Sequence, residues 1–170
     1  MTREQAQVET PIGVFRASVV DGAVQTAGFL VGGRRPTPNA RRDSAGVRDA
    51  LAAYFAGECD ALDAIQVAPE GTLFKQLVWK ALREIRAGET VSYGELAARV
   101  GAPGAARAVG TANATNPICL IIPCHRVIRA GGELGGYGFG VDRKRWLLAH
   151  EARPDGLFAA ATKAAGSTTV

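Results

Sequence analysis

The first third of the chain alternates short apolar segments with turn-forming residues, a pattern typical of strands. The segments GVFRASVV (residues 13–20) and AVQTAGFL (residues 23–30) are rich in apolar and β-branched residues. Asp21-Gly22 lies between them, and this dipeptide favours the tight turn of a hairpin. We therefore predict two antiparallel strands in this region.

A helical pattern follows a polar loop rich in Gly, Pro and Arg (residues 32–43). Ser44 is the candidate N-cap of this helix, and Gly57 is expected to end it. The apolar positions that recur at helical spacing are Val47, Leu51, Tyr54 and Phe55. Residues 59–71 read as an irregular linker, so we place a domain boundary near Pro69.

The second half opens with another helical pattern, TLFKQLVWKALREIRAG. Thr72 is expected to cap this helix, and Gly88 follows its last turn. The residues of its apolar stripe are Leu73, Leu77, Ala81 and Ile85. A stripe at this spacing predicts a helix that faces the core.

Two short helices joined by a glycine-containing turn are expected next. Ser92 and Glu95 in SYGELAARV form a capping box that starts a helix at Tyr93. The sequence GAP ends this helix, and GAARAVGTANA resumes helical composition. Such a pair is a candidate helix-turn-helix for binding DNA, although helix pairs that only pack together in a core share the pattern.

The apolar run PICLIIP (residues 117–123) predicts a buried strand that ends at Cys124-His125. A glycine-dense loop, AGGELGGYGFG (residues 130–140), comes after it. Asp142 is then expected to cap a final helix, RKRWLLAHE. The residues of this helix expected to face inward are Trp146 and either Leu147 or Leu148.

Together these elements predict an α+β (α/β) protein. A small strand-rich N-terminal domain would comprise residues 1–69, and a mainly helical domain containing the helix-turn-helix would comprise residues 70–153. The tail of residues 154–170 is rich in small residues and is predicted to be disordered.

Composition agrees with a globular protein that has one sizeable core or two small domains. Of the 170 residues, 47% are hydrophobic and 21% are charged. Because no apolar h-region opens the chain and no apolar run is long enough to cross a bilayer, we expect neither a signal peptide nor a membrane segment. A cytoplasmic location follows, where thiols stay reduced, and the three cysteines suggest no disulfide framework.

The net charge of +4 is unevenly distributed along the chain. Residues 1–70 hold seven Lys and Arg against nine Asp and Glu, a net charge of −2. Residues 71–170 hold thirteen against seven, a net charge of +6. A basic second half favours a polyanionic partner such as nucleic acid.

Cys124 and His125 are candidates for a reactive cysteine and its base. A thiol with the ordinary pKa of about 8.5 is only a few per cent thiolate at neutral pH, so a nucleophilic cysteine needs a nearby base or cation. His125 and Arg126 can supply these, and a histidine base needs an acceptor that orients it. The candidates for this acceptor are Glu151, Glu95 and Glu133. These residues alone leave a structural cysteine and an activated nucleophile equally open.

The other thiols and the second histidine have simpler interpretations. Cys119, Cys124 and His125 match no standard zinc-ligand spacing, so we predict no metal site. Cys119 lies in the middle of the apolar run and is expected to be inert core, whereas Cys59 in the linker is expected to be incidental. His150 is expected in the last turn of a helix, where a cation is favoured.

Five motifs occur in a characteristic order: SYGELA, AARAVG, NPICLIIPCHRVI, GYGFG and RKRWLLAHE. Their sequences and spacing resemble those of the O6-alkylguanine-DNA alkyltransferases, also called methylated-DNA–protein-cysteine methyltransferases. The sequence PCHR after an AARAVG helix is a highly specific signature of this family. The resemblance is close over residues 72–151, whereas residues 8–68 match only in pattern.

The resemblance implies a single-turnover repair protein that removes the alkyl group from O6-alkylguanine in duplex DNA. Cys124 would attack the alkyl carbon and keep the alkyl group, with no cofactor and no metal. His125 would activate the thiol through a water, and Glu151 would hold the imidazole. Tyr93 would donate its hydroxyl proton to the leaving guanine, and Asn116 would tie the helix-turn-helix to the active-site strand.

The resemblance also implies that the base is flipped out, because its O6 cannot be reached inside stacked DNA. Arg107 would fill the gap left in the stack, and the second helix would enter the minor groove. The small residues that would allow this close approach are Ala105, Ala106 and Ala108. Tyr93 would also touch the DNA, and the backbone amides that would bind phosphates lie near Gly94, Ala102 and Ala130. The implied partner is double-stranded DNA, bound by a monomer, and O4-alkylthymine is a second candidate substrate.

The alkylguanine pocket would be bracketed by the backbones of Cys124, Val127 and Gly138, with Tyr137 in its wall. At its rim the family usually has Tyr-x-Gly-Gly, whereas this chain has YGFG, with Phe139 in place of the first glycine. This large ring would either narrow the pocket or pack outward. We predict that it narrows the pocket against bulky alkyl groups.

Three other functions would share part of this pattern. A non-reacting alkyltransferase-like damage sensor would bind alkylguanine, but such relatives lack the cysteine that is Cys124 here. The C-terminal part of an adaptive-response regulator would need an N-terminal zinc domain, and this chain has no cysteine cluster to build one. A cysteine hydrolase would turn over repeatedly and would not need a basic helix-turn-helix.

Overall fold

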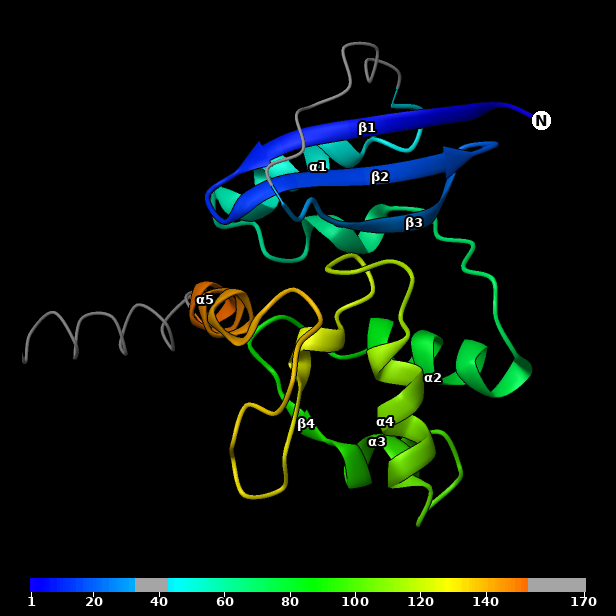
Figure 1. The fold of residues 1–170 in the computed structure, drawn as a ribbon, viewed down its shortest axis with the longest axis vertical. Helices are drawn as coiled ribbons and strands as arrows, with labels where there is room; N and C mark the ends of the chain where they lie inside the picture. Colours follow the sequence, from blue (N-terminus) through cyan, green and yellow to red (C-terminus); the bar gives the residue numbers. More distant parts are fainter. Residues whose placement is uncertain (33–42, 153–170) are drawn as a thin grey trace, which may run out of the picture.

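The structure is a computed structural model that describes residues 1–32 and 43–152, and its architecture is α+β, as predicted (Figure 1). The strands are β1 (Arg3–Thr10), β2 (Gly13–Val20), β3 (Ala23–Phe29), β4 (Val91–Ser92) and β5 (Val127–Ile128). The helices are α1 (Val47–Phe55), α2 (Leu73–Arg83), α3 (Tyr93–Arg99), α4 (Ala106–Ala114) and α5 (Val141–Glu151), with short 3₁₀ helices η1 (Ala61–Ala64) and η2 (Cys124–Arg126). The predicted disorder of residues 154–170 and most of the predicted polar loop lie outside the described residues.

Strands β1, β2 and β3 form an antiparallel meander. The predicted hairpin is confirmed, because β2 and β3 meet at Asp21 and Gly22, which have φ angles of 50° and 82°. β1 lies in the polar segment before this hairpin and pairs with β2 along its full length. Ala6 is the single buried residue of β1, so its sequence shows little of the apolar alternation that marks a strand.

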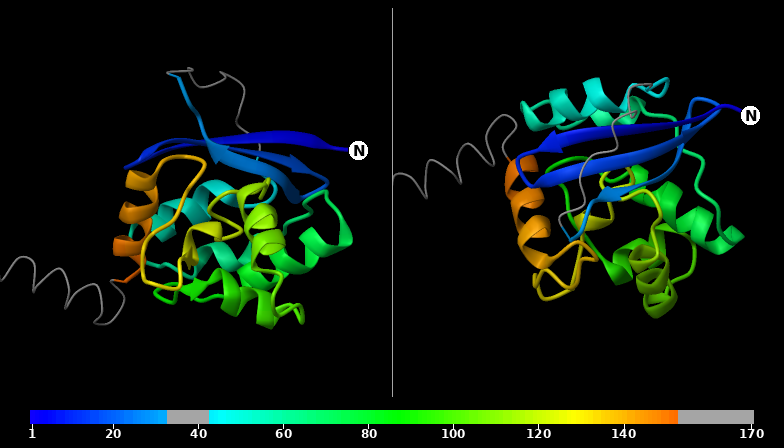
Figure 2. Two further views of the ribbon diagram at one scale, coloured as in Figure 1. Left: turned by 60° about the horizontal axis from the view of Figure 1, so that its bottom comes forward. Right: turned by 45° about the horizontal axis from the view of Figure 1, so that its top comes forward.

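Helix α1 packs on β1, and Figure 2 shows it lying alongside the sheet. The prediction that Ser44 caps this helix is wrong. The carboxylate of Asp43 instead accepts hydrogen bonds from the amides of Val47 (2.8 Å) and Arg48 (2.6 Å), because its two oxygens can serve two amides at once. Gly57 follows the helix with a φ of 118°, in agreement with the predicted end.

Helix α2 begins where predicted but turns a different face to the core. The hydroxyl of Thr72 caps it by accepting a hydrogen bond from the first turn (3.2 Å). Leu73 and Leu77 of the predicted stripe are 87% and 54% exposed. Ala81 of the predicted stripe is buried, and the other buried residues of the helix are Val78, Trp79 and Leu82. The helix also ends at Arg83, well before Gly88. Because both faces carry apolar residues, spacing alone did not identify the buried one.

Helix α3 begins at Tyr93, as the capping box predicts. The Ser92 hydroxyl accepts from the Glu95 amide (3.0 Å), and the Glu95 carboxylate accepts from the Ser92 amide (3.4 Å). After a turn that includes Gly101 and Gly104, both with positive φ, helix α4 packs against α2 and α3. Figure 1 shows these helices on the side of the molecule opposite to β1.

The apolar segment 117–123 is not the predicted strand. Leu120 has a φ of 70°, and one amide of the segment bonds to a carbonyl only two residues earlier (2.8 Å), so the chain folds into tight turns. The segment is enclosed by both halves of the protein, and the Cys119 amide donates to the Ala27 carbonyl of β3 (2.9 Å). Apolar composition correctly predicted burial, but a fully enclosed turn and a fully enclosed strand have the same composition.

Helix α5 is the last element of the described chain. The prediction that Asp142 caps it is wrong, because Gly140 occupies the N-cap position and Asp142 pairs with Arg145 (3.1 Å). Glycine has no side chain that could accept a hydrogen bond from the first amides of the helix. Leu147 is fully buried, as predicted for one of the two leucines.

Buried apolar side chains from both halves of the chain form one cluster. The division into domains near residue 69 therefore stays a prediction. In residues 1–32 and 43–152, none of the helices combines the length and apolar character needed to cross a membrane.

Candidate active site

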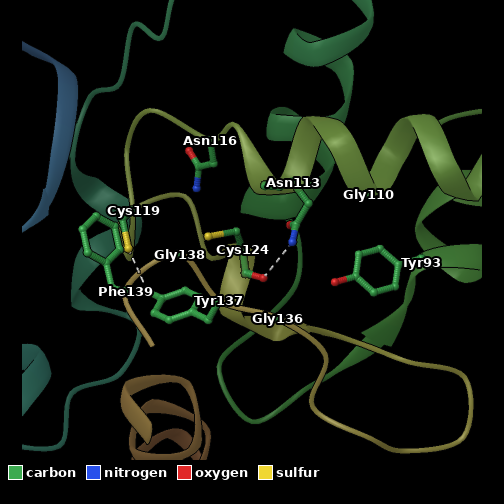
Figure 3. Close-up of a pocket in the computed structure, with 11 residues that line it drawn as sticks. Tyr93, Gly110, Asn113, Asn116, Cys119, Cys124, Gly136, Tyr137, Gly138 and Phe139 are labelled. Atoms are coloured by element: carbon green, nitrogen blue, oxygen red, sulfur yellow. Dashed lines mark hydrogen bonds between the residues drawn. The ribbon is translucent and has the colours of Figure 1, made fainter. Parts of the chain in front are cut away.

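Cys124 begins η2 and lines a pocket of about 230 Å³ (Figure 3). The walls of this pocket come from the start of α3, from α4, from the segment 117–123 and from the glycine-rich loop 130–140. The polar and aromatic side chains among them are Tyr93, Asn113, Asn116, Cys119, Tyr137 and Phe139. With 8% of its surface exposed, Cys124 is sheltered from bulk water while still lining the pocket.

His125 belongs to a buried network of charged and polar side chains. Its Nε2 lies 2.8 Å from Oε2 of Glu151. Arg126 donates to the same carboxylate through Nε (2.8 Å) and a terminal nitrogen (2.9 Å), and the Tyr54 hydroxyl donates to Oε2 (2.7 Å). Among the three candidate glutamates, the geometry places Glu151 at the imidazole. The other two serve the capping box of α3 and an exposed ion pair.

The hydrogen bond to Glu151 determines which nitrogen of His125 carries the proton. A carboxylate can only accept, so Nε2 is protonated in the neutral ring and Nδ1 keeps a lone pair. Within the described part of the chain, Nδ1 has no hydrogen-bond partner. Burial lowers the pKa of His125, although the charge of Glu151 acts in the opposite direction. The imidazole is therefore neutral near pH 7 and can accept a proton at Nδ1.

Several neighbours stabilise the anionic form of Cys124. The Cys119 side chain is the largest influence and outweighs burial, so the pKa of Cys124 lies below its ordinary value. Asn116 and the positive charge of Lys144 act in the same direction. The site thus favours the thiolate, which is the nucleophilic form of cysteine.

Lys144 on α5 is a site residue that sequence reasoning missed. Its side chain is fully buried, and its Nζ donates to the carbonyls of Val127 (2.7 Å) and Gly136 (3.2 Å). It thereby ties β5 to the glycine-rich loop and places a positive charge near Cys124. Val127, which is predicted to bracket the alkylated base through its backbone, is buried in β5, and its carbonyl accepts the hydrogen bond from Lys144. No signal distinguished Lys144, since both neighbouring residues are equally basic.

The predicted residues of α3 and α4 lie around the same pocket. Tyr93 is half-buried at the first position of α3, and burial raises the pKa of its hydroxyl, which stays protonated at neutral pH. Asn116 follows α4 and donates to the Ile122 carbonyl (2.8 Å), which holds the segment that precedes the thiol. Asn113, which sequence reasoning missed, donates to the carbonyl of Cys124 (3.3 Å).

Tyr137, Gly138 and Phe139 line the pocket from the glycine-rich loop. The ring of Phe139 packs edge-on against Phe29 of β3, with ring centroids 5.8 Å apart. It also lies directly over Gly28, where an added Cβ would come within 2.6 Å of the ring. Phe139 therefore lines the pocket and is also anchored on the N-terminal sheet.

The residues predicted to meet DNA lie around α3 and α4. Arg107 is exposed in the first turn of α4 and forms no ion pair within residues 1–32 and 43–152. The exposed residues of this group also include Gly94, Ala108 and Ala130, and the partly exposed ones are Ala102, Ala105 and Ala106. The surface beside Arg107 is thus made of small side chains.

The structure also places the remaining cysteines and the second histidine. Cys119 is buried as predicted, but it is not inert core, because it lines the pocket and its Sγ lies 2.7 Å from the Tyr137 hydroxyl. Cys59, which is expected to be incidental, is buried with its Sγ 3.8 Å from the His150 carbonyl. His150 lies in the last turn of α5, as predicted, and its Nε2 is 2.7 Å from the Tyr54 carbonyl. Among the described residues, no three His, Cys, Asp or Glu side chains are grouped as metal ligands would be.

We expect the free energy of unfolding to fall as the pH is lowered from about 7. Burial lowers the pKa of His125 below the ordinary value of about 6.5. The contribution of His125 to the free energy of unfolding is therefore complete above about pH 6.5 and is lost as the pH falls below that value. Burial alone would raise the pKa of Glu151, but its interactions with His125 and Arg126 hold it well below the ordinary value of about 4.3. Its contribution is therefore lost as the pH falls further, at up to about 1.4 kcal/mol per pH unit.

Denaturant unfolding between about pH 8 and pH 4 measures this dependence. In His125→Asn the part of the slope near pH 6 should disappear, while the part below about pH 4.5 should remain. A free energy of unfolding that stays constant from pH 8 to pH 5 would contradict the assignment of a neutral, buried His125.

Known proteins are similar to this chain in sequence and in fold. The family model of the 6-O-methylguanine DNA methyltransferase DNA-binding domain matches residues 73–153. A methylated-DNA–protein-cysteine methyltransferase of Mycolicibacterium paratuberculosis is 45% identical over 154 residues, which is 88% of this chain and 93% of the relative. A protein of the same name from Salmonella typhimurium is 55% identical over 106 residues, and this match spans 62% of each chain.

A solved structure extends the similarity to three dimensions. The crystal structure of Mycobacterium tuberculosis OGT in complex with DNA matches with a TM-score of 0.76 and 45% sequence identity, over 87% of this chain and 92% of that one. The similarity to the Mycolicibacterium protein likewise covers most of both chains. This chain therefore belongs to the methylated-DNA–protein-cysteine methyltransferase family.

Proposed function

We propose that this protein repairs DNA by direct reversal, transferring the methyl or other alkyl group from O6-alkylguanine in duplex DNA irreversibly to Cys124. The observation that carries this proposal is the pocket that Cys124 and Tyr93 both line. The pKa of Cys124 is lowered, and the next residue, His125, is buried and paired with Glu151. The DNA bound to the related Mycobacterium tuberculosis protein supports DNA as the partner.

The proposed chemistry is a single displacement. The Cys124 thiol passes its proton through a water to Nδ1 of His125, and the carboxylate of Glu151 stabilises the imidazolium. The thiolate attacks the alkyl carbon, so that the S–C bond forms while the C–O6 bond breaks and its electron pair moves to the guanine. Tyr93 gives its proton to the leaving base and recovers one, through solvent, from His125. The products are S-alkylcysteine and unmodified guanine.

Duplex DNA keeps O6 inside the stack, so the nucleotide must be flipped out to reach Cys124, at a cost of a few kcal/mol. We propose that α3 and α4 form a helix-turn-helix whose second helix enters the minor groove, where Arg107 fills the gap. The backbone amides proposed to hold phosphates are those near Gly94, Ala102 and Ala130. The protein would act as a cytoplasmic monomer without metal or cofactor, and O4-alkylthymine is a second candidate substrate.

A duplex that contains one O6-methylguanine tests this proposal. After incubation, we expect mass spectrometry to find one added methyl group on Cys124, and none in Cys124→Ala. Methyl transfer to Cys119 or Cys59 would overturn the assigned acceptor. A folded parent protein that binds the duplex without transfer would instead identify a non-reacting damage sensor.

We expect Phe139 to restrict the size of the alkyl group. The pocket of about 230 Å³ is smaller than the roughly 300–1,000 Å³ of typical small-molecule sites. The Phe139 ring is held between the pocket and Phe29, so it cannot move aside without losing this packing. Benzyl groups should therefore be removed poorly relative to methyl groups, and Phe139→Gly should raise the benzyl-to-methyl rate ratio by about tenfold, since overpacking costs about 1–3 kcal/mol.

Single-turnover rates on duplexes with either adduct give this ratio for each variant. Phe139→Leu keeps an apolar contact to Phe29 and should give an intermediate ratio. Phe55→Leu is the matched control, because this phenylalanine lies on α1 and packs on Trp146. The same ratio in the parent and in Phe139→Gly would show that the ring does not limit the pocket.

A further inference from the structure

A second thiol lies beside the proposed acceptor. Cys119 is 2% exposed and lines the same pocket as Cys124. Figure 3 shows the sulfur of Cys124 pointing toward Cys119. The displacement described above makes no use of Cys119, although its thiol lines the same pocket as the nucleophile.

Tyr137 determines the direction in which Cys119 can donate. Its hydroxyl lies 2.7 Å from the Cys119 sulfur, and either atom can in principle be the donor. A phenolic O–H is a stronger hydrogen-bond donor than a thiol S–H, so Tyr137 donates and the Cys119 sulfur accepts. Burial raises the pKa of both groups, so both keep their protons at neutral pH. The S–H of Cys119 is then available for Cys124.

We propose that Cys119 is a hydrogen-bond donor to the acceptor: Tyr137 donates to the Cys119 sulfur, and the Cys119 S–H donates to the sulfur of Cys124. This inference rests on the proposed function and deepens it by naming two residues that prepare the nucleophile. An S–H group is a weak donor, but an anionic acceptor and a polarising neighbour both strengthen the bond. Cys119 keeps its proton throughout, so no bond to it is made or broken.

The acidities of the two thiols suit these roles. Burial raises the pKa of Cys119 well above its ordinary value, whereas the pKa of Cys124 is lowered, so Cys124 loses its proton first. Other groups around Cys124 also affect its pKa, so removing Cys119 should lower the fraction of thiolate at neutral pH without abolishing it. The titratable groups around Cys124 are Tyr93, His125, Tyr137 and Lys144.

The pH dependence of Cys124 alkylation by iodoacetamide tests the proposal, because this reagent needs no DNA. Modification is followed from about pH 5 to pH 10 and assigned to Cys124 by peptide fragmentation. We expect Cys119→Ala to move the midpoint upward by about half to one pH unit, which is a roughly three- to tenfold lower rate at neutral pH. Cys119→Ser keeps a donor, so its midpoint should stay close to that of the parent protein. Cys59→Ala removes a buried thiol outside the pocket and should leave the profile unchanged.

An unchanged midpoint in Cys119→Ala would overturn the proposal. So would a rate that falls by the same factor at every pH in both Cys119→Ala and Cys119→Ser, because that result would indicate packing alone. Tyr137→Phe should move the midpoint in the same direction as Cys119→Ala, by a smaller amount. Transfer from an O6-methylguanine duplex is measured in parallel: its absence in the parent protein rejects the proposed function, whereas the iodoacetamide profiles decide the role of Cys119.

Discussion

Replacing Glu151 by glutamine is expected to lower the free energy of unfolding by about 3–5 kcal/mol and to slow alkyl transfer at least about tenfold. The carboxylate is 1% exposed and accepts hydrogen bonds from His125, Arg126 and Tyr54. A neutral amide leaves the buried charge of Arg126 uncompensated, and its N–H groups face other donors. It also no longer stabilises a protonated His125. Equilibrium unfolding and single-turnover transfer, measured well below the melting temperature, report these two effects separately.

Two further variants separate the charge of Glu151 from its other contacts. Tyr54→Phe removes one hydrogen bond to the carboxylate, so it should cost about 1.5–3 kcal/mol of stability while transfer stays near the parent rate. Glu133→Gln is the matched control, because its side chain is 74% exposed and its ion pair with Arg129 is long, at 3.6 Å. This change should cost less than about 1 kcal/mol. If Glu151→Gln were as stable and as reactive as the parent, Glu151 would have no part in the site.

Sequence alone predicted the features whose partners lie a few residues apart. The capping box of Ser92 and Glu95 and the Asp21-Gly22 turn are such features, because local geometry decides them. Features that depend on distant contacts were less predictable. The stripe that contains Leu73 satisfies helical periodicity as well as the buried face does, and only packing against α3 and α4 selects between them.

The same distinction applies to the active site. The motifs and the family resemblance identified Cys124 and proposed its partner Glu151, which the fold brings to His125. They did not identify a role for Cys119, because the apolar run that contains it reads as a strand. In a strand, residues five positions apart point to opposite faces, so the two thiols would be separated. The turn at Leu120, with its positive φ, brings both to one pocket.

Arg107→Ala is expected to slow transfer from duplex DNA by about 30- to 100-fold, because refilling the stack offsets a flipping cost of a few kcal/mol. Transfer from a single-stranded oligonucleotide should change by less than about threefold, since an unpaired base needs no such filling. The exposure of Arg107 and the small alanines next to it on α4 motivate this expectation. Single-turnover rates on matched single- and double-stranded substrates measure the difference.

The charge and the size of Arg107 can be separated in the same assay. Arg107→Lys keeps one phosphate-binding charge and should retain the salt dependence of DNA binding, but it should recover only part of the duplex rate. Arg145→Ala is the matched control, because Arg145 is an arginine with a 65% exposed side chain on α5, outside the two proposed DNA-binding helices. If Arg107→Ala slowed both substrates equally, its contribution would lie in general affinity for DNA. A loss confined to the duplex, with duplex binding unchanged, would place its contribution at the step in which the base leaves the stack. This result would link the surface of α4 directly to the chemistry at Cys124.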